Sequence, residues 1–156
     1  MVNVAVVGYG FAGKSFHSYL VGLEERFTLH TISTRSPERQ ARARADHAGV
    51  NVVGSLDDVL ADDDIGLVVL ATPHDTHRDL AIAVMDAGKP VVTDKIVAMN
   101  AAETIEMAAA AERNNVLFSV FHNRRWDWDF LTVQKAIADG YVGEPYLYES
   151  AIMRYG

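Results

Sequence analysis

Six short runs of nearly continuous apolar and β-branched residues recur along the chain, and longer segments of helical composition separate them. The apolar runs are residues 4–7, 28–33, 51–53, 67–71, 90–93 and 116–120, and the helical segments are residues 14–25, 38–47, 79–87 and 101–114. Continuous apolarity is typical of strands that are covered on both faces. Parallel strands need a crossover connection, which a helix supplies. The pattern therefore predicts an α/β fold with a doubly wound parallel Rossmann sheet over residues 1–120.

Residues 121–156 predict a different organisation. We expect a helix from 128 to 139, and the turn at 140–145 then leads into residues 146–153, whose aromatic and branched side chains favour a β-strand. Because nothing follows this strand to pair with it, we interpret it as the first strand of a missing second α+β domain, which holds substrate and makes a dimer. An antiparallel edge strand on the first sheet is the alternative. An exposed apolar strand invites pairing, so we also expect a homo-oligomer through it.

The composition excludes several classes of function. The chain has no cysteine, which rules out disulfide scaffolds, thiolate metal sites and cysteine nucleophiles. Its formal charge of −7 and the lack of a Lys/Arg-rich run argue against a nucleic-acid partner. No apolar stretch approaches the roughly 18 to 20 residues that span a bilayer, so no membrane partner is expected. The default prediction is a soluble cytoplasmic protein.

The sequence GYGFAG at residues 8–13 follows the first predicted strand directly and precedes a predicted helix. In a dinucleotide fold the first glycine makes the tight bend, the second lets the backbone approach a pyrophosphate, and the third lets helix and strand pack closely. The phosphates bind N–H groups at the start of the helix, where the helix dipole is positive. This turn predicts a cofactor site, although glycines also occur in plain turns. The predicted contact residues are Gly8, Gly10, Phe11, Ala12 and Gly13.

The end of the second predicted strand bears on the choice of cofactor. An acidic residue there would accept hydrogen bonds from the ribose 2′-hydroxyl of NAD. The chain has Ser33, Thr34 and Arg35 instead, and these residues suit a 2′-phosphate. A charge-assisted hydrogen bond contributes roughly 1.5 to 3 kcal/mol, so Arg35 alone supports a preference for NADP of about 10- to 150-fold. The alternative is a solvated arginine beside the helix start at Ser36-Pro37.

Lys95 is the candidate catalytic residue, together with Asp94. Both follow the strand at 90–93, and the carboxyl ends of strands are where open α/β sheets hold ligands. A lysine beside a nicotinamide hydrogen-bonds the substrate oxygen and stabilises alkoxide charge, with Asp94 orienting it or pairing with it. Without further information, an exposed Asp-Lys ion pair is the alternative interpretation.

Two further polar clusters follow predicted strands. Thr72 and Pro73 come after the fourth strand, with His74 and His77 close behind, and capping or plain surface is the alternative role for these histidines. The sequence offers no further ligands to complete a metal site around them, so none is predicted. Residues 121–129 mix arginines, tryptophans and aspartates, which suits either a sugar or polyol site or a hinge between domains held by ion pairs.

With these residues in place, the chain resembles the Gfo/Idh/MocA oxidoreductase family, named after glucose–fructose oxidoreductase and inositol dehydrogenase. Residues 119–127 look more narrowly like its NADP-dependent scyllo-inositol dehydrogenase branch. The resemblance covers essentially the whole chain. It rests on residues 8–13 with Phe16-His17, on Thr72-Pro73 with His77, on AGKPVVTDK at 87–95 and on GEP at 143–145.

The resemblance implies NADP-dependent transfer of a hydride between the nicotinamide and a sugar or polyol hydroxyl. It implies that Lys95 contacts the reacting hydroxyl and that Thr72, Pro73 and His77 lie near the nicotinamide ribose. Asn123 and Arg124 are added to the predicted cofactor contacts. Ile96 stands where the family has a proline, which is expected to loosen the turn that holds the lysine.

Family members carry a further domain that supplies an aspartate and a histidine for proton transfer and substrate binding. We therefore expect this chain to bind NADP, or NAD less readily, and to catalyse poorly or not at all. A stand-alone, non-catalytic NADP-binding or sensing module is the alternative.

Overall fold

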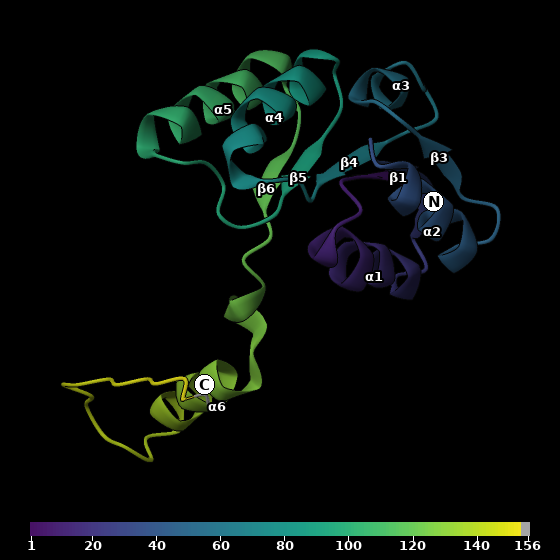
Figure 1. Cartoon of the computed structure of the whole chain (residues 1–156). Helices are drawn as coiled ribbons and strands as arrows, with labels where there is room; N and C mark the ends of the chain where they lie inside the picture. Colours follow the sequence, from purple (N-terminus) through teal and green to yellow (C-terminus); the bar gives the residue numbers. More distant parts are fainter. Residues whose placement is uncertain (154–156) are drawn as a thin grey trace. The chain divides into compact units, whose positions relative to one another are not determined.

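The computed structural model describes residues 1–153, which form two compact units, Met1–Phe121 and a second unit that begins at His122. The first unit contains a six-stranded sheet in the order β3-β2-β1-β4-β5-β6 (Figure 1). All neighbouring strands pair in parallel. This confirms the predicted doubly wound Rossmann sheet. The strands are β1 (Val2–Val7), β2 (Phe27–Ser33), β3 (Asn51–Val53), β4 (Leu67–Leu70), β5 (Val91–Thr93) and β6 (Phe118–Val120).

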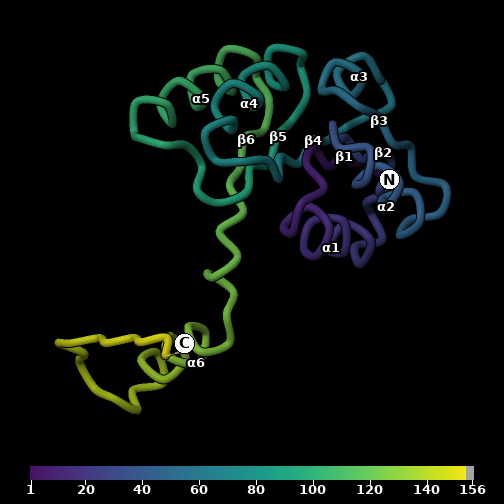
Figure 2. Tube along the Cα trace, in the orientation of Figure 1, coloured from purple at the N-terminus to yellow at the C-terminus, as the bar shows by residue number. Residues whose placement is uncertain are grey.

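Helices cover both faces of the sheet (Figures 1 and 2). One face is covered by a π-helical turn, η1 (Gly13–His17), that continues into α1 (Ser18–Leu23), and by α2 (Pro37–Asp46). The other face carries α3 (Leu56–Leu60), α4 (His77–Asp86) and α5 (Ala101–Asn114), with a short 3-10 turn, η2 (His74–Thr76), before α4. The predicted helix at 101–114 is confirmed, and its stop at Asn115 is a left-handed residue with φ 51°.

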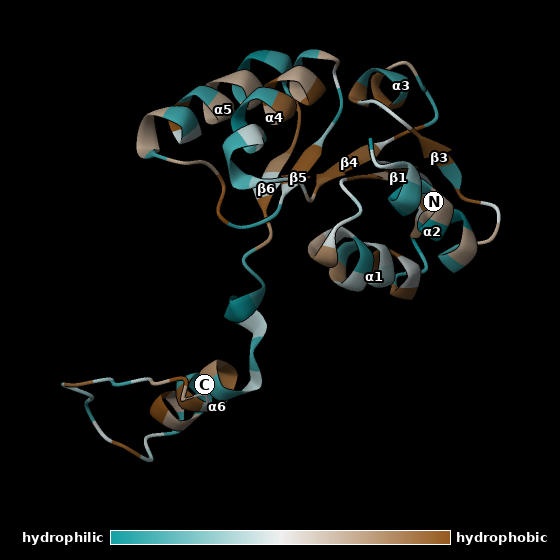
Figure 3. Cartoon of the chain, in the orientation of Figure 1, coloured by the Kyte–Doolittle hydropathy of each residue, from teal (hydrophilic) through white to brown (hydrophobic). Residues whose placement is uncertain are grey.

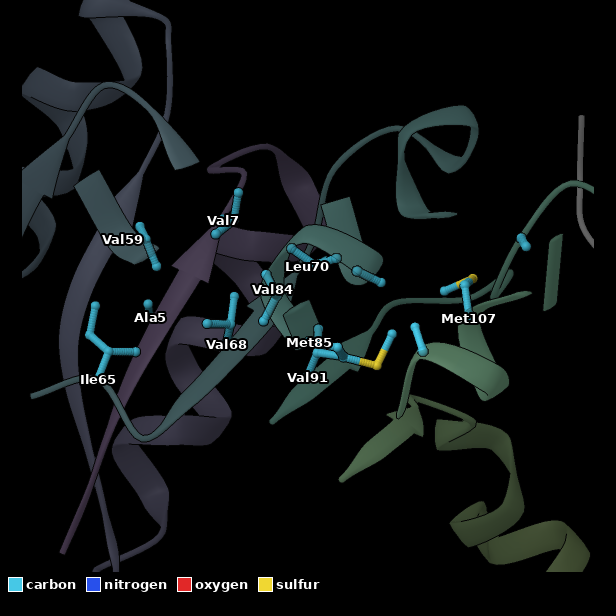
Figure 4. Close-up of a cluster of buried hydrophobic side chains, with 13 residues drawn as sticks. Ala5, Val7, Val59, Ile65, Val68, Leu70, Val84, Met85, Val91 and Met107 are labelled. Carbon is cyan, nitrogen blue, oxygen red and sulfur yellow. The ribbon is translucent and has the colours of Figure 1, made fainter. Parts of the chain in front are cut away.

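The core has two layers because successive strand residues point to opposite faces. Ala5 and Val7 of β1 belong to the large cluster under α3, α4 and α5, whereas Val4 and Val6 pack on the α1 side with Val21. Figure 4 shows the large cluster, and Figure 3 shows the strands as the most hydrophobic part of this unit. Both faces are therefore covered, which is what the continuous apolar runs predicted.

The sequence missed α3, whose five residues are too few to show a helical period. Its start nevertheless carries a capping box, in which Ser55 and Asp58 bond each other's backbone N–H groups. Predicted boundaries elsewhere shift by one to a few residues at element ends, where caps and fraying decide the last residue.

The second unit contains a 3-10 turn, η3 (Asn123–Trp126), and α6 (Trp128–Ala138). The strand predicted over 146–153 is not formed, because a strand needs a hydrogen-bonded neighbour and none of the described residues provides one. This segment is exposed, with Tyr146 at 98% and Met153 at 93%. Within residues 1–153, no helix is long and apolar enough to cross a membrane.

Candidate cofactor site

The glycine turn, residues 8–13, joins β1 to the helix that η1 and α1 form together. Gly8 has φ +97°, and a Cβ atom there would lie 2.5 Å from the Ala71 carbonyl oxygen. A Cβ atom on Gly13 would overlap the Gly8 carbonyl oxygen. The protein's own backbone therefore requires glycine at both positions.

Gly10 differs from the other two glycines of the turn. The nearest atom to a Cβ placed there is Nη1 of Arg39, at 3.9 Å, and Gly10 has no positive φ. Neither packing nor backbone conformation explains why this residue lacks a side chain. The space above Gly10 is where the pyrophosphate of a dinucleotide approaches the backbone, so the turn fits such a group.

The start of the following helix supplies hydrogen-bond donors at the same place. The first hydrogen bond of this helix runs from the Lys14 N–H to the Gly10 carbonyl oxygen, at 2.9 Å. The N–H groups of Phe11, Ala12 and Gly13 precede that bond and have no acceptor in the helix. Together with the helix dipole, these donors make an anion-binding position directly beside Gly10.

The end of β2 lies beside this turn, because the Gly8 N–H donates to the Ser33 carbonyl oxygen at 2.8 Å. Ser33 and Thr34 are buried, and the Ser33 hydroxyl donates to the Ser55 carbonyl oxygen at 2.9 Å. This strand end presents no carboxylate of its own to a ribose 2′-hydroxyl. Arg35, which follows it, is exposed.

Arg39 is a candidate site residue that sequence reasoning missed. It lies in the first turn of α2, and its backbone N–H bonds the Ser36 side chain, which caps this helix. Its guanidinium is the group closest to the open space above Gly10. Nothing in the neighbouring sequence marks Arg39, because its place in the site comes from the position of α2 beside the glycine turn.

The turn after β4 is fixed by a buried histidine. His77 is completely buried, and its ring nitrogens lie 2.8 Å from the Ile96 carbonyl oxygen and 3.1 Å from that of Thr72. The Thr76 hydroxyl donates to the Thr72 hydroxyl at 2.8 Å. His77 therefore joins the turn at Thr72-Pro73 to the turn at Lys95, and its own side chain is enclosed by protein.

Asp94 and Lys95 follow β5, and Asp94 was expected to orient Lys95 or to pair with it; among the described residues their side chains form no ion pair. One carboxylate oxygen of Asp94 accepts the Lys95 backbone N–H at 2.7 Å, and the other lies 3.4 Å from Nε2 of His17. Burial lowers the pKa of His17, and the neighbouring Asp94 opposes this shift. Because Asp94 is turned toward His17, the exposed Lys95 ammonium is left available to a ligand.

The strand register brings these turns to one edge of the sheet. Val7 pairs with Ser33 on one side and with Leu70 on the other, and Leu70 pairs with Thr93. The ends of four strands therefore form one row, with the glycine turn at its centre between β2 and β4. This is the topological switch point of the sheet, where open α/β folds bind their ligands.

Asn123 and Arg124 belong to the second unit. Arg124 pairs with Asp127 at 2.7 Å, and Oδ1 of Asn123 is buried without a donor among the described residues. Their contribution to a cofactor site remains a prediction. No group of three or more His, Cys, Asp or Glu in the described part of the chain is placed to hold a metal ion.

The sheet order, the glycine turn and its free amides define the class of this domain, a Rossmann fold that binds a dinucleotide. A family model described as "Oxidoreductase family, NAD-binding Rossmann fold" matches residues 2–122, and the chain belongs to this Gfo/Idh/MocA family.

Similar proteins and solved structures support this assignment. The chain is 38% identical to the uncharacterized oxidoreductase YdgJ of Escherichia coli over 154 residues, which is 99% of this chain and 44% of the relative. It is 35% identical to the scyllo-inositol 2-dehydrogenase (NADP(+)) IolW of Bacillus subtilis over 154 residues, 99% of this chain and 42% of the relative. The crystal structure of an oxidoreductase from Klebsiella pneumoniae superimposes with a TM-score of 0.85 and 39% identity, covering 91% of this chain and 40% of the other. The chain spans less than half the length of these relatives.

Proposed function

We propose that this chain binds NADP in preference to NAD and acts as the cofactor-binding part of an enzyme that oxidises or reduces a sugar or polyol. The observation that carries this proposal is the open space above Gly10, which has helix amides on one side and the Arg39 guanidinium on the other. The helix amides and the Arg39 guanidinium both attract an anion. The name of the Bacillus subtilis relative supports NADP, whereas the family description is NAD-binding, so the choice of cofactor needs a direct test.

Each phosphate of the cofactor has its own partners in this proposal. The pyrophosphate lies against the amides of Phe11 and Ala12, which also gain from the positive end of the helix dipole. The 2′-phosphate lies beyond the end of β2, where Arg35 and Arg39 are exposed cations. A carboxylate at this strand end would repel that phosphate, and the chain places Ser33 and Thr34 there.

Lys95 is the proposed catalytic residue. When bound, the cofactor supplies or accepts a hydride at its nicotinamide. Lys95 donates a hydrogen bond to the substrate hydroxyl and stabilises negative charge on that oxygen. Two contacts hold the turn that carries this lysine: Asp94 accepts the Lys95 backbone N–H, and His77 contacts the Ile96 carbonyl oxygen. The Ile96 turn is therefore fixed from two sides without the family's proline.

Fluorescence titration of the chain with NADPH and NADH tests the cofactor proposal. We expect NADPH to bind about tenfold more tightly or better, and Arg35→Ala or Arg39→Ala to reduce that ratio. Arg113→Ala is the matched control, because Arg113 forms an ion pair with Asp86 on α4 and lies outside the glycine turn. Equal affinity for both cofactors, unchanged in both site variants, would refute the NADP preference.

Turnover is expected to be absent from this chain alone. We infer that substrate binding and proton transfer need residues outside it, since the chain covers only 44% or less of its named relatives. A steady-state assay with polyols and NADP that gave robust turnover by the isolated chain would overturn this inference.

A further inference from the structure

A single carboxylate holds both ends of the glycine turn. Asp46, the last residue of α2, accepts a hydrogen bond from the Tyr9 hydroxyl at 2.9 Å and pairs with the Lys14 ammonium at 2.8 Å. Tyr9 lies two residues before Phe11, and Lys14 follows Gly13, so the two contacts bracket the proposed phosphate-binding amides.

The Tyr9 contact begins in the core, whereas the Lys14–Asp46 ion pair is partly exposed. The Tyr9 side chain is 2% exposed and packs in a cluster with Ile32 of β2 and Ala43 of α2. The His47 ring meets it edge-on at 6.0 Å. The pKa of Asp46 is lowered, first by the bond from Lys14 and then by the bond from Tyr9, so the carboxylate is charged at neutral pH.

The turn has few other hydrogen bonds. The Gly8 N–H donates to the Ser33 carbonyl oxygen, the Lys14 N–H makes the first helix bond to the Gly10 carbonyl oxygen, and the Ser18 hydroxyl donates to the Gly13 carbonyl oxygen at 2.8 Å. A segment with three glycines loses more conformational entropy on ordering than other segments do. A site whose donors are fixed before the ligand arrives avoids that cost at the moment of binding.

We infer that Asp46 is a positioning residue for the cofactor: through Tyr9 and Lys14 it fixes the glycine turn so that the amides of residues 11–13 face the pyrophosphate. This inference rests on the proposed dinucleotide site and adds a residue that touches no part of the ligand. It also gives Lys14 a role that differs from the obvious one, a cation that binds phosphate directly.

The two roles of Lys14 predict opposite effects of Asp46→Asn. If Asp46 positions the turn, Asp46→Asn weakens NADPH binding by about fivefold, and the effect is no larger because the ion pair is partly exposed. NADH binding weakens by the same factor, since both cofactors share the pyrophosphate, so the NADPH to NADH ratio stays within about twofold. If Lys14 instead binds phosphate and Asp46 competes for it, the same substitution frees Lys14 and NADPH binds more tightly.

The experiment is a set of NADPH and NADH titrations of the full chain. The variants are Asp46→Asn, Tyr9→Phe, Lys14→Met and the double variant Asp46→Asn/Lys14→Met, with Asp86→Asn as control. Asp86 is also an ion-paired aspartate, bonded to Arg113 and Asn114, so its substitution changes the net charge equally without touching the glycine turn. Thermal unfolding confirms that each variant is folded at the titration temperature. If Asp46→Asn fails to fold, Tyr9→Phe removes the other contact of Asp46 while Lys14 stays in place, and only the positioning role then predicts weaker binding.

The inference predicts weaker binding of both cofactors in Asp46→Asn and Lys14→Met, and in the double variant a loss smaller than the sum of the two. Unchanged or tighter NADPH binding in Asp46→Asn, or additive losses in the double variant, overturns it. Failure of the wild-type chain to bind either cofactor would instead refute the proposed function, which keeps the two failures distinct.

Discussion

Replacing Gly10 by alanine separates cofactor binding from folding. The new Cβ atom meets only the end of the Arg39 side chain, at 3.9 Å, and needs no change of φ. Alanine reduces the entropy of the unfolded chain, which stabilises by about 0.4 to 1 kcal/mol. Alanine is also less favourable than glycine at the N-cap position before a helix, which lowers the stability of the folded chain by a similar amount, roughly 0.5 to 1 kcal/mol.

These two terms nearly cancel, so the melting temperature of Gly10→Ala is expected to change by less than about 2 °C. The methyl group nevertheless occupies the space where the pyrophosphate approaches the backbone. Loss of one charge-assisted hydrogen bond costs about 1.5 to 3 kcal/mol, and NADPH affinity should therefore fall by about tenfold or more.

Calorimetry without ligand and NADPH titration by fluorescence measure the two effects on one preparation. Wild-type affinity in Gly10→Ala would refute the placement of the pyrophosphate above this residue. A large drop in melting temperature would refute the claim that packing leaves this position free.

Three further predictions concern other parts of the chain. Gly13→Ala should lower the melting temperature by roughly 5 °C or more in calorimetry, because its Cβ overlaps the Gly8 carbonyl oxygen; an unchanged value contradicts that geometry. Burial lowers the pKa of His17 in the folded chain. The neutral His17 side chain therefore contributes its full stabilisation above the unfolded-state pKa of about 6.5. That stabilisation is lost as the pH falls through the lower pKa of the folded chain. Denaturant unfolding between pH 7.5 and 5.5 should show a smaller loss of stability in His17→Asn than in wild type or in the exposed control His74→Asn, and equal losses in all three count against it. We also propose that the exposed segment 146–153 mediates self-association; Tyr146→Lys should then reduce the mass measured by light scattering at high concentration, and a wild-type monomer excludes the idea.

The sheet could be predicted because its strands are buried on both faces and are separated by helices long enough for crossovers. Local signals also fixed the start and end of α5, where Asn100 caps the first turn and Asn115 takes a left-handed conformation. Residues 146–153 show the limit of such reasoning. Their side chains favour a strand, but a strand is a property of two segments, and the described residues supply no second one.

Within the candidate site, the glycine turn was predictable, because only glycine meets the physical requirements at its positions. Gly8 and Gly13 are required by backbone contacts, and Gly10 stands out because no contact requires it. Arg39 and Asp46 were missed because their importance comes from α2 packing beside the glycine turn, and nothing in their sequence neighbourhood shows this.

Two side chains make contacts that the sequence did not reveal. Asp94 is next to Lys95 in the chain, yet its carboxylate is not paired with the Lys95 ammonium and lies beside His17 of η1. His77, which the family resemblance places near the nicotinamide ribose, is fully buried between two turns, and its contact with a cofactor stays a prediction. In both cases a tertiary contact decides the role of a side chain that the sequence could only place on a particular turn.

The most direct test of where the cofactor binds is a map of backbone amide shifts in ¹H–¹⁵N spectra on addition of NADPH. We predict that the largest shifts fall on residues 10–13, followed by residues 33–39, and that they are lost in Gly10→Ala. Binding of NADPH with the amides of residues 10–13 unmoved would contradict the claim that the cofactor's phosphates lie against this turn.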